Sequence, residues 1–397
     1  MRNFHAPVWL HAFNRPTTPT FVTLYTLEAF SRASLVTVIP LIAFQHLGDA
    51  QKVSLLYFAV GLLGLCSSFA VPWLVNRLTR RGVLSLGTTA VAVAMVLLSL
   101  NNPYFFMAGM ALHLFGGACT EVSISLYLMD HVPRHEMGRF EPVRLVYSGL
   151  AWTVGPWLGV FLKNEIAIWV PFAMAGLVNG SLLAYFWYLR LTDNVAVSTK
   201  RRPVTNPIKF VHRFVAQPRL LLSWSLAVGR AGWWGMFFVY APIYVVSMGF
   251  SENLAGALSS LATLFVMTIP LVAKHTRRFG TRKVLMVGYF GCGMATILVA
   301  TATGLPWLSI AILGTAAVLA VPIDSVGNTL FFRAVHSYER AEMTTVFSTY
   351  RYGAQLVFPG AFAMVLKVFA LPAVFAAAGS GMVALGLLAA KVPKSME

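Results

Sequence analysis

Residues 26–44 read TLEAFSRASLVTVIPLIAF, and residues 226–246 read LAVGRAGWWGMFFVYAPIYVV. Each stretch lies in an apolar run long enough to cross a bilayer as a helix, and each carries one arginine, Arg32 or Arg230. A guanidinium group stays charged at physiological pH, and placing it inside a membrane costs at least about 2.5–3.5 kcal/mol. Because the chain carries this cost twice, we expect both charges to serve a purpose in the interior of a membrane protein.

The composition supports a membrane location. Hydrophobic residues make up 58% of the chain, charged residues make up 11%, and the mean hydropathy is +0.72. Soluble domains contain about 25% charged residues, so we predict an all-α integral membrane protein. The 3 cysteines lie in apolar stretches, so we expect no disulfide framework and no metal site. The first 19 residues are polar and mixed, so we expect no cleavable signal peptide.

Cutting the chain at its polar loops predicts twelve transmembrane helices. We expect them at residues 20–44, 53–75, 83–101, 104–129, 142–162, 167–190, 219–247, 253–273, 284–303, 305–330, 345–368 and 371–390. The long polar segment 191–217 separates the first six helices from the last six. It predicts an N-terminal six-helix bundle over 1–190 and a C-terminal six-helix bundle over 218–397, joined by a cytoplasmic linker that includes a short amphipathic stretch on the membrane surface.

The net charge of +17 has a topological origin. With both termini in the cytoplasm, the outer loops and helix ends hold only Lys52, Lys163 and Lys367, and Arg32 and Arg230 lie within the membrane. The remaining lysines and arginines fall on the cytoplasmic side, as the positive-inside rule requires. We therefore expect a bilayer as the partner of this basic chain, and no nucleic acid.

The two halves carry a repeat. A single offset of 198 positions relates Arg32 to Arg230, Pro72 to Pro270, Arg80 to Arg278 and Gly82 to Gly280. Further along the chain the alignment drifts, since Glu121 and Asp324 are 203 positions apart and Arg144 and Arg351 are 207 apart. Duplicated six-helix halves predict two pseudo-symmetric bundles with a substrate site near the midplane.

The loop after the second predicted helix carries the first signature of a known family. It contains Arg77, Arg80 and Gly82, and its counterpart in the second half contains Arg278 and Gly280. This pattern resembles the Gly-x-x-x-Asp-Arg-x-Gly-Arg loop of the major facilitator superfamily, although the leading Gly and the Asp are absent in both halves. The resemblance covers essentially the whole chain and implies gating loops at these positions. A basic loop that only fixes the topology is the alternative.

Two further motifs also resemble that superfamily. Residues 112–139, LHLFGGACTEVSISLYLMDHVPRHEMGR, are similar to its fourth helix and following loop, with His113 and Gly116 where relatives often have Arg and Gln. Asp130 and Arg139 keep the loop pattern and are expected to act in gating. The sequence Gly155-Pro156-Trp157-Leu158-Gly159 is similar to a motif of its antiporter branches, although close helix packing alone would also explain it.

The paired arginines resemble the organophosphate–phosphate exchangers of the same superfamily, in which arginines on the first and seventh helices bind phosphate. The resemblance implies that Arg32 and Arg230 bind an anionic group, because a guanidinium fork suits phosphate or carboxylate oxygens. Trp234 and Tyr240 follow Arg230 and are expected to line the cavity, with ordinary aromatic packing or an interface belt as the alternative. Glu28 is a departure, since an acid beside Arg32 would weaken an anion site.

Several titratable side chains are candidates for proton coupling. Glu28 lies one helical turn before Arg32, Glu121 lies in the middle of the fourth helix, and Asp324 has a matching place in the tenth. A buried carboxyl group can take up and release a proton as its surroundings alternate, and His113 could relay protons. The alternatives are a local ion pair for Glu28, a buried hydrogen-bonded acid or an interhelical salt bridge, with Arg32 or Arg144, for Glu121 and Asp324, and a neutral packed histidine.

Known catalytic motifs are absent from the sequence. It contains no GxxxxGK[ST], HExxH, CxxC or GxSxG, so we expect no enzyme, no cofactor and no ATP hydrolysis. We predict a monomeric secondary transporter in the bacterial inner membrane that works by alternating access with protons and moves a small organic anion. The alternative is a proton-driven exporter of an amphipathic drug, metabolite or lipid, for which the cavity would be larger and aromatic.

Overall fold

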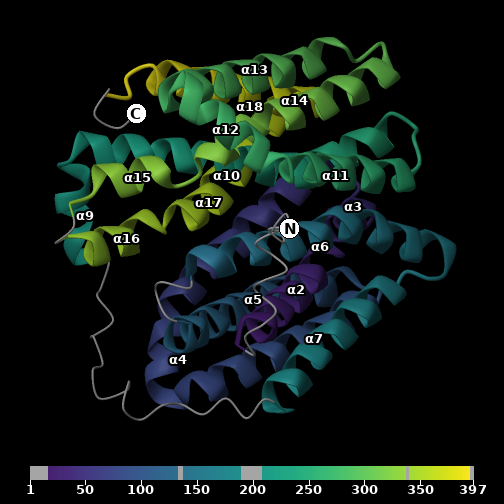
Figure 1. The fold of residues 1–397 in the computed structure, drawn as a ribbon. Coiled ribbons are helices and arrows are strands. Elements are labelled where there is room, and N and C mark those ends of the chain that lie inside the picture. The colour runs from purple at the N-terminus through teal and green to yellow at the C-terminus, as the bar shows by residue number, and fades with distance from the viewer. Residues whose placement is uncertain (1–16, 133–136, 189–207, 337–338, 394–397) are drawn as a thin grey trace, which may run out of the picture. The chain divides into compact units, whose positions relative to one another are not determined.

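The computed structural model describes residues 17–132, 137–188, 208–336 and 339–393, which contain helices and no strands (Figure 1). The first half of the chain forms α2 (Thr17–Ala33), α3 (Val38–Leu47), α4 (Ala50–Ser99), α5 (Pro103–His131), α6 (Met137–Glu165) and α7 (Val170–Tyr188). The second half forms α9 (Ile208–Val215), α10 (Pro218–Ser247), α11 (Glu252–Val266), α12 (Ile269–Phe279), α13 (Thr281–Thr301), α14 (Pro306–Val326), α15 (Thr329–Ala334), α16 (Arg340–Phe347), α17 (Tyr350–Val368) and α18 (Pro372–Ala389).

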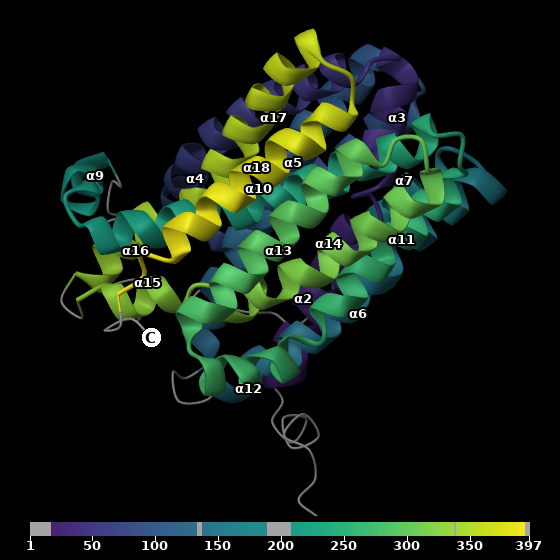
Figure 2. The ribbon, with the colours of Figure 1, turned by 90° about the horizontal axis from the view of Figure 1, so that it is seen from above.

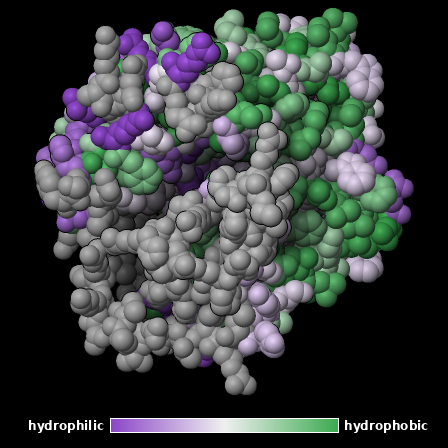
Figure 3. All heavy atoms as spheres, in the orientation of Figure 1, coloured by the Kyte–Doolittle hydropathy of each residue, from purple (hydrophilic) through white to green (hydrophobic). Residues whose placement is uncertain are grey.

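Ten segments of the described residues are long and apolar enough to cross a membrane. They correspond to ten of the twelve predicted helices, and α10 and α17 occupy the other two predicted spans. On the face shown in Figure 3, hydrophobic residues cover broad areas of the described surface. Large apolar side chains such as those of Leu177 and Met364 are 74% and 77% exposed. Such exposure would be costly in water and is expected of a surface that faces lipid, so the predicted all-α membrane fold is confirmed.

The chain forms two compact units. Unit 1 comprises residues 1–39 and 63–201, and unit 2 comprises residues 40–62 and 202–397. Unit 2 therefore includes most of α3 and the beginning of α4, which precede most of unit 1 in the sequence. The domain boundaries drawn from the linker sequence stay a prediction.

In unit 1, the first predicted membrane helix is broken. Helix α2 ends at Ala33 and α3 begins at Val38, with turns between them. Pro40 supplies the reason, because its ring clashes with the carbonyl group four residues earlier and it has no N–H group to donate. The last turn of α2 carries Arg32, so the charged side chain lies directly before the break.

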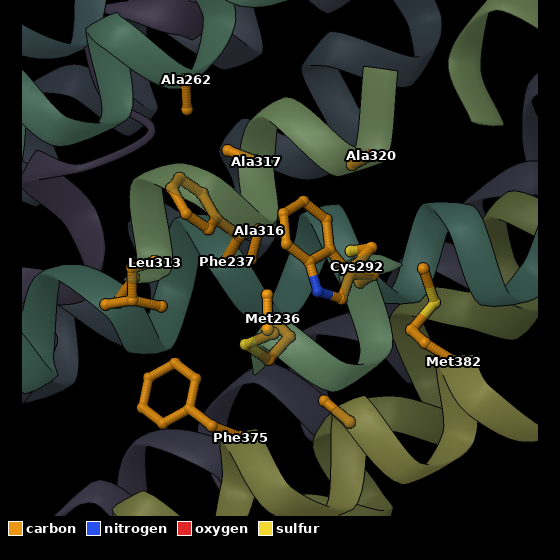
Figure 4. Packing of buried hydrophobic residues seen from close by; sticks show 14 of the residues in the cluster. Met236, Phe237, Ala262, Cys292, Leu313, Ala316, Ala317, Ala320, Phe375 and Met382 are labelled. Carbon is orange, nitrogen blue, oxygen red and sulfur yellow. The ribbon is translucent and has the colours of Figure 1, made fainter. Parts of the chain in front are cut away.

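In unit 2, helices α13, α14 and α18 lie side by side (Figures 1 and 2). A close approach of Gly293 and Gly379 brings α13 and α18 together, since a Cβ atom on Gly379 would lie 2.6 Å from the carbonyl oxygen of Gly293. The core between these helices and α10 contains Met236, Phe237 and Leu313 (Figure 4). It holds α10, and with it Arg230, in a fixed position.

The segment 40–62 packs within unit 2 on α10, α11 and α17. The hydroxyl groups of Ser54 and Tyr240 lie 2.7 Å apart, and both side chains are fully buried. Gln45 donates to the carboxylate of Glu252 at 2.6 Å. These hydrogen bonds hold the segment against α10 and α11.

Two of the predicted loops and the linker have identifiable features. Thr79 interrupts α4 with a φ of 63°, which marks the loop predicted between the second and third membrane helices. Gly280, with a φ of 85°, separates α12 from α13. Within the predicted linker, α9 is a short helix whose Phe214 is buried against the α15–α16 region.

Candidate functional site

A polar cluster in unit 1 surrounds Arg32. Its guanidinium group lies 3.3 Å from the carboxylate of Glu28, one turn earlier on α2, and 3.5 Å from that of Glu121 on α5. The side chain of Glu28 is only 10% exposed, whereas those of Arg32 and Glu121 are 43% and 36% exposed. The cluster is therefore a charged network with one deep carboxylate and a more accessible arginine–glutamate pair.

The geometry around Arg32 depends on close packing of α6. A Cβ atom on Gly155 would lie 2.8 Å from the Cβ of Ala33, and one on Gly159 would lie 1.8 Å from the carbonyl oxygen of Ser34. The Gly-Pro-x-x-Gly sequence thus packs against the two residues that follow Arg32. Close packing, the alternative considered for this motif, is therefore its observed structural role.

The environment of Arg32 includes an aromatic neighbour on α6. The ring of Trp152 lies 5.9 Å from the Arg32 guanidinium carbon. Arg144 forms an ion pair with Glu141 and lies over the ring of Tyr25 at 4.9 Å. The pairing of Glu121 with Arg32 is the interhelical salt bridge considered for it. The sequence did not single out Tyr25, Trp152 or Glu141, because aromatic residues and i, i+3 ion pairs are too common to identify a site.

His113 lies on α5, two turns before Glu121. Its Nδ1 atom is buried and has no hydrogen-bond partner among the described residues. Gly116, in the same motif, approaches α4 so closely that a Cβ atom would lie 2.6 Å from the Gly87 carbonyl oxygen. A side chain at this position would require α4 to shift. A proton-relay function of His113 stays a prediction.

A second polar cluster, in unit 2, surrounds Arg230 on α10. Its Nε atom lies 3.9 Å from the carboxylate of Asp324 on α14, and its Nη2 atom donates to the side chain of Asn328 at 3.0 Å. The indole N–H of Trp234 donates to the same carboxylate at 2.8 Å. Arg230 and Asp324 are 15% and 16% exposed. Arg230 has no acid near it in sequence, and the tertiary structure supplies one from another helix.

A helix break adjoins this second cluster as well. Gly327, with a φ of 53°, ends α14, and Asn328 precedes α15. Only glycine adopts this backbone conformation without strain. A small pocket lies beside Arg230 and is lined in part by Ser223, Tyr289 and Asn328. Irregular backbone inside a membrane is tolerated where it is buried in protein or lines a cavity, so the break gives Arg230 polar partners that a regular helix would not offer.

Each of the two clusters contains an arginine paired with a carboxylate from another helix. In unit 1 the arginine of the first membrane helix contacts the acid of the fourth, Glu121, and in unit 2 the arginine of the seventh contacts the acid of the tenth, Asp324. The sequence repeat therefore has a structural counterpart within each unit. At the offset of 198, the position matching Glu28 is Leu226, so the third charge of the first cluster is missing from the second.

Two residues near Arg230 lie on α17. The ring of Tyr350 lies 5.9 Å from the guanidinium carbons of both Arg230 and Arg351, and the Nε atom of Arg351 donates to the Tyr350 hydroxyl at 3.3 Å. Arg351 corresponds to Arg144 at an offset of 207, and its sequence context indicated no function. The drift of the repeat to an offset of 207 was the one signal that could have singled it out.

The aromatic residues after Arg230 are packed closely. Trp233 is 1% exposed and contacts Trp234 and Phe237. Tyr240 is 1% exposed and its hydroxyl is bonded to Ser54. Trp234 is partly buried and supports Asp324. Substrate contacts of Trp234 and Tyr240 stay predictions.

The predicted gating residues lie near helix ends. Arg77 lies over the ring of Trp73 at 4.7 Å, and Arg278 lies over that of Phe279 at 5.6 Å. The remaining predicted gating residues are Arg80, Gly82, Gly280, Asp130 and Arg139. The side chains of Asp130 and Arg139 lie outside the described part of the structure. The described residues contain no group of three or more His, Cys, Asp or Glu side chains that could hold a metal ion.

Each of the two compact units of apolar helices holds an arginine–carboxylate pair. The model of the major facilitator superfamily matches residues 21–359. The chain therefore belongs to that superfamily and is a secondary transporter. No curated sequence relative matches it.

Solved structures with the same fold include transporters of different solutes. The peptide transporter POT in complex with sulfate superimposes with a TM-score of 0.73 at 14% identity, covering 98% of this chain and 95% of the other. The nucleoside transporter NupG gives a TM-score of 0.72 at 14% identity, covering 94% and 98%. A POT family transporter in complex with 5-aminolevulinic acid gives 0.73 at 14% identity, covering 93% and 94%. At this identity the likeness is one of fold.

Proposed function

We propose that the protein couples proton movement to the transport of a small organic anion that carries a carboxylate or phosphate group. In this proposal it works as a monomer by alternating access in a bacterial inner membrane, with both termini in the cytoplasm. Arg32 and Arg230 are the proposed anion-binding residues. Glu28, Glu121, Asp324 and His113 are the proposed residues for proton coupling.

The arginine–carboxylate pair inside each unit is the observation that carries this proposal. A guanidinium group next to a carboxylate can exchange that partner for a substrate oxyanion, since both offer the same pair of acceptor oxygens. Protonation of Glu121 neutralises its carboxylate and so weakens its ion pair with Arg32. The ion pair between Arg32 and Glu28 is kept. Uptake of a proton would in this way change what Arg32 can bind.

The packing of α10 supports a small substrate rather than a large amphipathic one. Trp233 and Phe237 belong to the core, and Tyr240 is bonded to Ser54. An exporter of amphipathic compounds would need such side chains to line an open cavity. We therefore favour the organic anion over the exporter alternative.

A ligand screen on the detergent-purified protein tests the proposal. The probes are lactate, malate, glycerol 3-phosphate and inorganic phosphate, with tetraphenylphosphonium as an amphipathic cation, at mildly acidic and at neutral pH. A ligand that binds the folded state raises its stability by about 2.7 kcal/mol at one hundred times its Kd. We expect at least one anion to raise Tm and to accumulate in proteoliposomes under an inward proton gradient.

Glu121→Gln provides the coupling test, and Glu141→Gln is its matched control. Both variants lose one carboxylate in unit 1, but only Glu121 contacts Arg32, whereas Glu141 pairs with Arg144. We expect anion uptake by Glu121→Gln to become independent of the proton gradient while Glu141→Gln keeps the dependence. A Tm rise with tetraphenylphosphonium alone would contradict the anion proposal and favour the exporter.

A further inference from the structure

Asn328 lies at a position where asparagine usually stabilises the start of a helix. It precedes α15 as the N-cap residue, and an N-cap asparagine commonly accepts hydrogen bonds from the first backbone N–H groups of its helix. The side chain of Asn328 makes no such capping hydrogen bond. Its oxygen accepts instead from Nη2 of Arg230 on α10, at 3.0 Å. The amide is therefore engaged with the arginine and not with the helix end.

Arg230 has a neutral partner close to it and a charged partner further away. The carboxylate of Asp324 lies 3.9 Å from Arg230 Nε, which is within ion-pair range but beyond hydrogen-bond distance. That carboxylate has a donor of its own, because the indole N–H of Trp234 donates to it at 2.8 Å. The direct hydrogen bond of Arg230 goes to the Asn328 amide. An amide oxygen orients a guanidinium group without cancelling its charge, so Arg230 keeps the capacity to attract an anion.

Gly327 leaves one edge of Arg230 without a covering side chain. A Cβ atom on Gly327 would lie 3.6 Å from Arg230 Nη1, so any longer side chain at this position would contact that nitrogen. The φ of 53° at Gly327 requires glycine there. Arg230, Gly327 and Asn328 also line one small pocket within unit 2. The helix break thus presents the amide to Nη2 and keeps the side of Nη1 clear.

We propose that Asn328 is a positioning residue for anion binding, which holds Nη2 of Arg230 and leaves Nη1, on the side of Gly327, for the anionic group of the substrate. The assignment rests on the proposed function and adds to it the residue that keeps the arginine oriented and still charged. The partner at residue 328 has to be neutral. A carboxylate in its place would form an ion pair with Arg230 and compete with the substrate for the guanidinium group.

The test measures the affinity of the purified full-length protein for lactate, malate, glycerol 3-phosphate and inorganic phosphate by the concentration dependence of Tm. Asn328→Ala removes the acceptor, Asn328→Gln keeps a neutral amide, and Asn328→Asp keeps an acceptor but adds a negative charge. Asn179→Ala is the matched control, because Asn179 is buried on α7 in unit 1 and donates to the Thr88 carbonyl oxygen at 2.8 Å. The Tm of each variant without probe reports whether it folds.

We expect Asn328→Ala to bind the anion that the wild type recognises about tenfold more weakly, as for loss of a hydrogen bond to a charged group. Asn328→Gln should recover part of this loss, whereas Asn328→Asp should bind at least as weakly as Asn328→Ala. Asn179→Ala should lose stability with less than a threefold change in affinity. A residue that only supports the fold would give a different order, with aspartate restoring what alanine loses.

A double variant shows whether Asn328 acts through Arg230. Arg230→Gln combined with Asn328→Ala should bind no more weakly than Arg230→Gln alone, since the amide then has no guanidinium group to orient. Additive losses would overturn the assignment, as would unchanged affinity in Asn328→Ala, wild-type affinity in Asn328→Asp or an equal loss in Asn179→Ala. These outcomes leave the proposed function intact, because the wild type still binds an anion. If no probe raises the Tm of the wild type, the proposed function itself fails and this assignment falls with it.

Discussion

Gly159 packs so closely on Ser34 that a Cβ atom on the glycine would lie 1.8 Å from the serine carbonyl oxygen. This contact joins α6 to the break in the first membrane helix, one turn from the charged network of Glu28, Arg32 and Glu121. The position of Arg32 thus depends on a residue that has no side chain. Several consequences of such contacts can be measured.

Gly159→Ala is expected to destabilise the protein by about 1–3 kcal/mol or more, because the added methyl group overlaps backbone that cannot move without shifting α2. Gly180→Ala is the matched control, since no atom lies within 4 Å of a Cβ atom at that position of α7. The control should be neutral or stabilised by up to about 1 kcal/mol, as alanine favours helices. Thermal melting in detergent measures both, and a Gly159→Ala variant as stable as the control would disprove the close contact.

Asp324→Asn is expected to destabilise unit 2 by about 1–3 kcal/mol, because Arg230 loses its carboxylate partner while remaining mostly buried. The amide oxygen of the new asparagine can still accept the hydrogen bond from the Trp234 indole. The measured loss of stability therefore reports the loss of the negative charge. Asp49→Asn removes the same charge at the start of α4, where asparagine caps a helix equally well, and should be neutral. Equal Tm values for Asp324→Asn and the wild type would show that the ion pair contributes nothing to stability.

Ser54→Ala is expected to cost about 1–3 kcal/mol, since it leaves the buried hydroxyl of Tyr240 without its partner. Tyr240→Phe should cost less, because Ser54 retains its hydrogen bond to the Ala50 carbonyl group. The double variant should be no less stable than Ser54→Ala, which would give a coupling energy of about 0.5–1.5 kcal/mol in a double-mutant cycle. Strict additivity would argue against a direct bond between the two hydroxyls.

Arg213→Gln is expected to lower stability by about 1–3 kcal/mol. Arg213 on α9 forms an ion pair with Glu339, whose side chain is 7% exposed and also accepts from Gln217 at 3.1 Å. Removing the arginine leaves a buried carboxylate with only a neutral donor. Arg219→Gln, at an exposed position, is the control for the loss of charge. Similar melting of the two variants would indicate that α9 is not held by this pair.

Much of the fold was accessible from local sequence. Long apolar runs predict membrane helices because an unpaired backbone polar group is costly in lipid, and the described residues contain the expected helices. The offset of 198 relates Arg32 to Arg230, and each arginine pairs with the acid of the membrane helix three further along in its own unit. The repeat was visible because duplication preserves residue spacing along the chain.

The break before Pro40 also had a local cause, the missing N–H group and the ring of proline. The predicted membrane span over 20–44 lies within residues 19–47, which are long and apolar enough to cross a membrane. Within this span, turns at residues 34–37 separate α2 from α3 directly after Arg32. At this point the backbone is contacted by Gly155 and Gly159, which lie on a different helix, α6.

The sequence by itself determined that the chain spans the membrane repeatedly, that its halves are repeats and that Arg32 and Arg230 carry charge into apolar helices, since all three follow from composition and spacing. Tertiary structure decided which groups surround those charges. Asp324 on α14, Asn328 in the turn that follows and Tyr350 on α17 lie around Arg230, and Glu121 reaches Arg32 from α5. The physical reason is that helix formation depends on neighbours within a few residues, whereas a partner for a buried charge is set by how distant helices pack.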